Sequence, residues 1–234
     1  MMGGMKPRHV APVMAVAIAL AGCTNANDSA PRPEEEGVTR ASSCSYPLAG
    51  EPAKPVDPPS ENDVVNTGEA KVTLHMTAGD VEITMDRATA PCTVNSFVSL
   101  AQQGWLDETS CHRLVDHGIF VLQCGDPTGT GTGGPGYSIP DELSPNVTSL
   151  EKLDGDKVNY PPGTVAVANS GPETGGSQWF IVWDDSPLPP HYTVFGTVDE
   201  AGLEVVRGIA AQGVDAADRI TPIAEARITS VTLG

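Results

Sequence analysis

Three glycines near the middle of the chain, Gly129, Gly131 and Gly134, have the spacing of a dinucleotide-binding fingerprint. Such a fingerprint holds a pyrophosphate only when a strand precedes the glycines and a helix begins directly after them. Here the glycines run into Pro135-Gly-Tyr-Ser-Ile-Pro140, which cannot start a regular helix. The pattern therefore predicts a loop that approaches another part of the chain closely or needs positive φ angles, and it argues against a nucleotide site.

Two further chemistries find little support in the sequence. A serine hydrolase of the G-x-S-x-G type is excluded because the stretch from Gly175 to Gln178 reads Gly-Gly-Ser-Gln. Cys111, His112 and Cys124 lie close together in the sequence, but no C-x-x-C pair or recognised zinc spacing is present. We therefore expect no metal site.

Two blocks about 40 residues apart carry the most informative residues. The first begins Cys-His-Arg-Leu-Val115 and continues from Gly118 to Asp126 into the glycine stretch, and the second runs from Ala168 to Ile181. They contain H-R, F-x-x-Q-x-G-D, G-T-G-G, A-N-x-G-P and G-S-Q-x-F in this order. In this arrangement the chain resembles the cyclophilin family of peptidyl-prolyl cis/trans isomerases from about Lys71 to Leu233.

The resemblance implies a role for each matching residue. Arg113 takes the place of the catalytic arginine, and Gln123 and Phe120 stand beside it as catalytic-site residues. The implied substrate-binding residues are Val121, Gly131, Ala168, Asn169, Ser170, Gln178 and Phe180, with Leu188 and Tyr192 completing the proline pocket. The resemblance implies proline-containing polypeptides as substrates and no cofactor.

The residue types suit this reaction. Rotation about a peptide bond is opposed by amide resonance, which creates a barrier of roughly 18–20 kcal/mol, and breaking that resonance requires no nucleophile. A guanidinium that donates a hydrogen bond to the pyramidal prolyl nitrogen would favour the twisted state. Arg113 suits this role because it is permanently charged, and Gln123 could orient it.

Several positions depart from the most familiar eukaryotic pattern. The turn between Arg113 and Phe120 is two residues longer, which puts the approach of the arginine to the groove in doubt. The tryptophan that usually lines the pocket edge is replaced near Pro187, which should weaken binding of cyclosporin-type inhibitors. Tyr192 stands where histidine is common, as it often does in bacterial members.

The elements that must position these residues are mostly strands. Alternating apolar residues in 72–76 and 81–85 predict a β-hairpin around the turn 77–80, and apolar spacing predicts helices over 91–103 and 201–211. Further strands are expected at 111–115, 118–123, 163–168, 179–183, 193–198 and 227–233. Eight short strands and two helices predict a mainly β fold: a closed eight-stranded antiparallel barrel capped by two α-helices.

The first 22 residues are typical of a cleaved export signal. Lys6 and Arg8 precede an apolar run, 10–20, that is too short for a comfortable membrane span. The run ends in Leu-Ala-Gly-Cys23, which resembles the lipobox of bacterial lipoproteins, where the cysteine is lipidated and becomes the new N-terminus. Residues 23–66 hold seven prolines without a sustained period and predict a disordered tether, followed by the isomerase domain at 67–234.

If Cys23 carries lipid, Cys44, Cys92, Cys111 and Cys124 remain, and two disulfides are plausible outside the cytosol. Three pairings are possible. If Arg113 and Gln123 both face the groove, strand alternation places Cys111 and Cys124 on opposite faces, which argues mildly against a bridge between them unless a bulge intervenes. Cys44 would then pair with one of them and Cys92 with the other, and a bridge from Cys44 would fasten part of the tether to the domain.

The formal charge of −17 disfavours nucleic acid and anionic membrane surfaces as partners. Membrane attachment therefore rests on the lipid alone. We expect a monomeric isomerase on the outer face of a bacterial cytoplasmic membrane that assists the folding of exported chains. The alternative is a cyclophilin-shaped binding module or holdase with little turnover.

Overall fold

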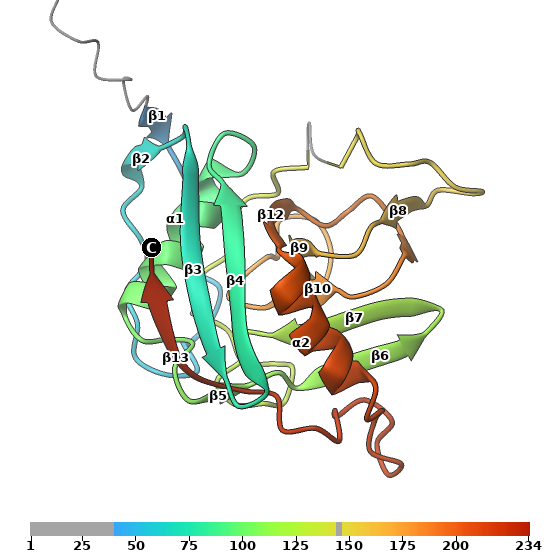
Figure 1. Cartoon of the computed structure of the whole chain (residues 1–234). Coiled ribbons are helices and arrows are strands. Elements are labelled where there is room, and N and C mark those ends of the chain that lie inside the picture. Colours follow the sequence, from blue (N-terminus) through green and yellow to red (C-terminus); the bar gives the residue numbers. More distant parts are fainter. Residues whose placement is uncertain (1–39, 144–146) are drawn as a thin grey trace, which may run out of the picture. The chain divides into compact units, whose positions relative to one another are not determined.

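The computed structural model describes residues 40–143 and 147–234. The expected export signal, the lipidated Cys23 and the first part of the tether lie outside these residues. The described chain is mainly β with two helices, and its principal sheet is a curled antiparallel sheet of nine strands (Figure 1). In spatial order the strands are β5 (Thr109–Ser110), β13 (Arg227–Leu233), β3 (Glu69–Met76), β4 (Gly79–Asp86), β12 (Val194–Val198), β9 (Thr164–Val167), β10 (Trp179–Val182), β7 (Ile119–Cys124) and β6 (Arg113–His117).

The hairpin β3–β4 confirms the expected alternation. Its ladder is continuous from Glu69 opposite Asp86 to Met76 opposite Gly79. The apolar residues of one face are buried, and Val72, Leu74, Val81, Ile83 and Met85 all belong to the main core. Period-two patterning alone thus identified both strands and the face that each turns inward.

Both helices form close to their expected positions. In α1 (Pro91–Gln102) the proline occupies the first turn, where its missing N–H costs no hydrogen bond, and the ring of Phe97 packs against Trp179 and Phe195. In α2 (Glu200–Ala210) the Asp199 side chain caps the helix by accepting a hydrogen bond from the N–H of Gly202. Helix α1 packs on β13, β2 (Asn62–Val65) and β4, whereas α2 packs on β4 and crosses in front of the sheet in Figure 1.

The strand ladder differs from the closed eight-stranded barrel expected from the sequence. The nine-stranded order ends at β5 on one side and β6 on the other, and only Cys111 and His112 separate these two strands in the chain. The sheet is therefore a half-barrel within the described residues. Two smaller antiparallel pairs accompany it: β1 (Arg40–Ser43) with β2, and β8 (Val158–Tyr160) with β11 (Ser186–Leu188).

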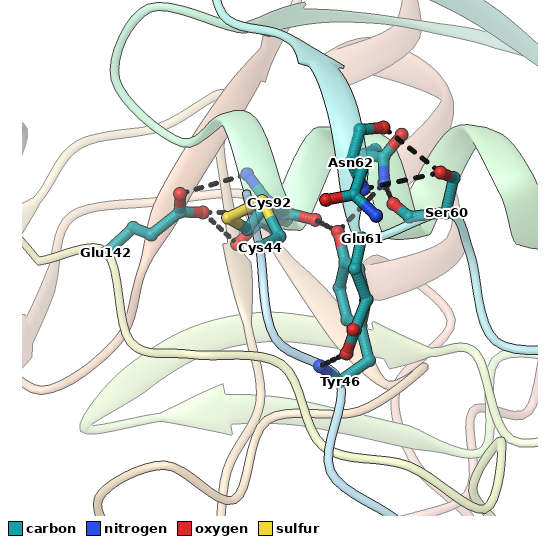
Figure 2. The surroundings of a disulfide bond; sticks show 9 residues. Cys44, Tyr46, Ser60, Glu61, Asn62, Cys92 and Glu142 are labelled. Atoms are coloured by element: carbon teal, nitrogen blue, oxygen red, sulfur yellow. Dashed lines mark hydrogen bonds between the residues drawn. A yellow bond between two sulfur atoms is a disulfide. The ribbon is translucent and has the colours of Figure 1, made fainter. Parts of the chain in front are cut away.

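Residues 44–66 differ from the tether predicted for them. Cys44, Tyr46 and Val64 are buried in the main core, and Tyr46 Oη donates a 2.9 Å hydrogen bond to the carbonyl of Cys92. Figure 2 shows these contacts at the start of α1, where Glu142 also accepts hydrogen bonds from the backbone of Cys92 and Thr93. Tertiary contacts hold this segment in place, and these contacts require no periodic pattern of apolar residues. The sequence therefore gives no signal that the segment is ordered.

Two disulfides are present, Cys44–Cys92 and Cys111–Cys124. The preference against pairing Cys111 with Cys124 was wrong. The prediction placed Cys111 in the same strand as Arg113 and assumed that side chains alternate between the two faces from Cys111 onward. In the structure β6 begins at Arg113. The N–H of Cys111 donates to the carbonyl of Ala226 instead. Outside the ladder Cys111 is not bound to one face of the sheet, and its Cα lies 3.9 Å from that of Cys124.

In the part of the chain that the structure describes, the helices are too short or too polar to cross a membrane.

We predict that the Cys44→Ala/Cys92→Ala double variant loses about 2–4 kcal/mol of unfolding free energy, because the bridge closes a long loop. The two cysteines are 48 residues apart. Urea unfolding of the full chain under non-reducing conditions measures the difference. A loss below about 0.5 kcal/mol, the range of substitutions that remove no structural feature, would show that the bridge does not fasten residues 44–66 to the domain.

Candidate functional site

Arg113 and Gln123 face each other on the hairpin of β6 and β7. They are direct cross-strand partners, and Arg113 Nη1 donates a 3.1 Å hydrogen bond to Gln123 Oε1. The two extra residues after Arg113 lengthen the ladder as far as His117 opposite Ile119, with Gly118 turning the chain at a φ of 76°. The longer turn thus lies at the far end of the hairpin and leaves the register of Arg113 intact.

Gln178 holds the other end of the Gln123 amide. Gln123 Nε2 donates a 2.8 Å hydrogen bond to Gln178 Oε1. In turn, Gln178 Nε2 donates to the carbonyls of Gly131 and Gly133, at 2.9 Å and 3.0 Å. Because each donor has a defined acceptor, this series of hydrogen bonds fixes the orientation of both amides and points Gln123 Oε1 at the guanidinium.

A pocket of about 100 Å³ opens beside this pair. Arg113 and Gln123 form its polar edge together with Asn169. The apolar lining residues are Ile119, Val121, Ala168, Phe180, Leu188 and Tyr192. The rings of Phe180 and Tyr192 meet edge to face at 5.4 Å. Phe180 belongs to an apolar cluster apart from the main core, and Tyr192 packs against that cluster. A small apolar ring would fit between this lining and the guanidinium.

Phe120, to which the resemblance gives a role at the catalytic site, is not among the residues that line this pocket. Its ring packs against Trp183 with centroids 4.9 Å apart, and its N–H donates to Ser186 Oγ. Successive residues of β7 alternate between faces, so Ile119 and Val121 share the pocket face with Gln123 while Phe120 points away. Counting back from Gln123 in steps of two residues would have identified Ile119 as a pocket residue.

A glycine loop, defined as residues 125–138, is organised around Asp126. This fully buried carboxylate accepts hydrogen bonds from Thr128, through its N–H and Oγ1, and from the N–H groups of Gly131 and Gly133. Burial raises the pKa of Asp126, but these hydrogen bonds lower it by more, and the net shift is downward. A Cβ at Gly133 would lie 2.0 Å from Asp126 Oδ1, so the expectation that the glycines permit a close approach is confirmed.

A second pocket, of about 460 Å³, adjoins the first. Gln123, Ala168 and Asn169 line both pockets. Three residues predicted for substrate binding, Gly131, Ser170 and Gln178, line the second pocket and not the first. The second pocket is also lined by 49–51, a stretch that no sequence signal connects with the site.

The described residues include no group of three His, Cys, Asp or Glu side chains that could hold a metal ion. Cys111 and Cys124 are joined to each other and offer no thiolate. His112 is buried beside the glycine loop, and burial lowers the pKa of its imidazole. A Cβ at Gly131 would lie 3.4 Å from its ring, so the imidazole packs directly against the glycine loop.

Known proteins of one enzyme family are similar to this chain in sequence and in structure. Residues 71–233 match the family model of cyclophilin-type peptidyl-prolyl cis-trans isomerases. A cyclophilin from Cryptosporidium parvum is similar in structure, with a TM-score of 0.60 and 27% identity over 71% of this chain and 98% of that one.

Curated relatives are also similar in sequence. A probable peptidyl-prolyl cis-trans isomerase B of Mycobacterium tuberculosis (strain ATCC 25618 / H37Rv) is 43% identical over 207 residues, which cover 86% of this chain and 67% of the relative. The corresponding protein of Mycobacterium leprae (strain TN) is 45% identical over 81% of this chain and 66% of its own length. The chain thus spans about two thirds of the length of these relatives. Because one residue follows the family match, an alignment covering 86% of the chain must extend into the segment before residue 71.

We predict that Asp126→Asn lowers the unfolding free energy by about 2–4 kcal/mol near pH 7, because it replaces charge-assisted hydrogen bonds with a buried mismatch. The folded pKa of Asp126 lies below its unfolded value, so the stability that it contributes is fully present above about pH 4. This stability is lost as the pH falls through the folded pKa. Urea unfolding from about pH 7 to about pH 2 should therefore show the difference between wild type and variant shrinking in acid, and a constant difference would contradict this assignment.

A pair of neighbouring glycines tests the close approach in the loop. Gly133→Ala should cost about 1–3 kcal/mol of unfolding free energy, because its methyl group would displace the Asp126 carboxylate. Gly134→Ala is the matched control, since a Cβ there meets no atom within 4 Å and the variant should be nearly neutral. Equal losses in the two variants, measured by urea unfolding, would show that the contact with Asp126 is unimportant.

Proposed function

The chain belongs to the cyclophilin-type peptidyl-prolyl cis-trans isomerases, and we propose that it acts on X-Pro bonds of exported protein chains, with Arg113 as the catalytic residue. One observation carries this assignment: an oriented guanidinium lies at the edge of an apolar pocket. An enzyme that rotates a bond needs a hydrogen-bond donor held in place and a pocket for proline, and it needs no nucleophile.

In the proposed mechanism, the proline ring enters the pocket between Val121, Phe180 and Leu188. Burial of the ring fixes the prolyl nitrogen near Arg113, and contacts at Asn169 hold the neighbouring backbone. As the bond twists, the nitrogen becomes pyramidal and its lone pair is no longer delocalised into the carbonyl. A hydrogen bond from the guanidinium to that lone pair is stronger in the twisted state than in either planar isomer, and the barrier falls accordingly.

Gln123 orients the guanidinium of Arg113 before this step. The guanidinium has five N–H donors, and the hydrogen bond to Gln123 Oε1 uses one of them. The remaining donors can reach the substrate while the side chain stays in one orientation. A side chain that is already oriented loses less conformational entropy when the transition state forms, which favours turnover over simple binding.

A catalytically weak binding module or holdase is the second candidate. It would use the same apolar pocket to grip proline-containing segments and would gain nothing from an oriented arginine. The hydrogen bonds that hold Arg113 and Gln123 therefore favour the enzyme.

We further propose a monomer attached by lipid at Cys23 to the outer face of a bacterial cytoplasmic membrane, assisting the folding of exported chains. Support comes from the signal-like first 22 residues, the lipobox-like sequence that ends at Cys23, and two disulfides, which persist in oxidising compartments.

We predict that Arg113→Ala lowers kcat/KM for an Ala-Pro test peptide by about 10²–10³-fold, as expected when one transition-state donor is removed. Cis/trans exchange spectroscopy by NMR measures the rate directly in the full chain. Arg113→Lys keeps the charge but not the planar fork, and it should recover only a small part of the activity. If folded wild type leaves the exchange rate at its uncatalysed value, or if Arg113→Ala is fully active, the proposal is wrong.

A further inference from the structure

Residues 47–54, called the strap here, lie before the residues that the family model matches and run along the glycine loop. The N–H of Ala49 donates to the carbonyl of Gly136 at 2.8 Å, and the N–H of Ser138 donates to the carbonyl of Pro47 at 2.9 Å. The N–H of Ala53 donates to the carbonyl of Gly134 at 2.9 Å. The strap thus pairs with the loop through backbone hydrogen bonds along most of its length.

The ends of the strap are fastened to α1 and to the turn after it. On one side, the Cys44–Cys92 bridge and the hydrogen bond from Tyr46 Oη to the carbonyl of Cys92 hold the chain just before the strap (Figure 2). Burial raises the pKa of Tyr46 to about 12, so its phenol remains a donor. On the other side, Lys54 Nζ donates to the carbonyl of Gly104 at 2.8 Å and lies 5.7 Å from the ring centre of Trp105. A segment held in this way keeps its position beside the site.

The strap forms one wall of the second pocket through Ala49, Gly50 and Glu51. Among the described residues that line this pocket, Glu51 alone carries a charge, and it is exposed. The second pocket meets the proline pocket at Gln123, Ala168 and Asn169. A substrate whose proline occupies the first pocket would therefore place a neighbouring side chain in the second, whose volume of about 460 Å³ accommodates a long one.

From this arrangement we propose that Glu51 is a specificity determinant, which makes the enzyme prefer substrates with Lys or Arg within two residues of the proline. The inference rests on the isomerase function proposed above and names the substrate class of that site. A long basic side chain would lay its methylene groups along the pocket and bring its charge to the Glu51 carboxylate at the rim. Since Glu51 is exposed, the preference should be about two- to fivefold, the range of a solvent-exposed ion pair.

The overall negative charge of the chain is a competing explanation, because it attracts every basic peptide. Glu82 supplies the matched control. It lies on β4 and pairs with Lys71 at 3.0 Å, and it lines neither pocket. Glu82→Gln removes the same charge as Glu51→Gln without touching the site.

The experiment measures kcat/KM by NMR exchange for peptides with Lys, Ala or Glu at each of the two positions before and after proline. Wild type and Glu82→Gln should both favour Lys over Ala by about two- to fivefold at one position at least. Glu51→Gln should bring that ratio close to one, Glu51→Lys should favour Glu, and about 1 M salt should abolish the preference of wild type.

The outcomes separate the inference from the function on which it rests. If wild type accelerates the Ala peptides but shows no preference for Lys, or if Glu51→Gln keeps the full preference, the role of Glu51 is refuted and the isomerase function stands. If Glu82→Gln loses the preference as Glu51→Gln does, overall charge is the cause and the role of Glu51 is again refuted. If no peptide is accelerated, the proposed function fails and the inference fails with it.

Discussion

The hydrogen bonds accepted by the buried carboxylate of Asp126 are the interactions on which the rest of the site depends. A charge in the interior is tolerated only when hydrogen bonds replace its lost hydration, and Thr128, Gly131 and Gly133 supply them. By turning these donors inward, the carboxylate fixes the carbonyls of the glycine loop that orient Gln178. Through Gln178 and then Gln123, the same constraint reaches Arg113. The site is thus positioned by a continuous series of hydrogen bonds that begins at a group no substrate touches.

This construction suits a reaction in which no bond forms or breaks. Catalysis of rotation depends on one donor held where the prolyl nitrogen becomes basic, and a flexible arginine would lose much of its advantage in becoming ordered. The Cys111–Cys124 bridge ties the chain two residues before β6 to the end of β7, next to Arg113 and Gln123, which limits movement of the strands that carry them. The strap fastens the outer side of the glycine loop. One covalent bridge and one set of backbone hydrogen bonds therefore restrain the elements that carry this series.

Periodicity and spacing predicted the parts of the molecule that follow local rules. The β3–β4 hairpin and both helices could be predicted because alternation and helical spacing determine which residues share a face. The association of Arg113 with Gln123 was expected from the family resemblance, and the structure pairs the two residues directly. The role of Phe120 came from resemblance alone, whereas alternation along β7 places Ile119 and Val121 on the face of Gln123. The Cys111–Cys124 bridge was disfavoured because the start of β6 was taken two residues too early. The packing of residues 44–66 against the domain was not predicted, because it depends on tertiary contacts, which leave no periodic pattern in the sequence.

The role proposed for Gln123 in catalysis is to orient Arg113. A double-mutant cycle on kcat/KM for an Ala-Pro peptide, with Arg113→Ala, Gln123→Ala and the double variant, tests it most directly. If Gln123 acts through Arg113, removing Gln123 slows the enzyme only while the arginine is present, and the double variant matches Arg113→Ala alone. Losses that multiply in the double variant would contradict the account, because they would show that the two residues act independently.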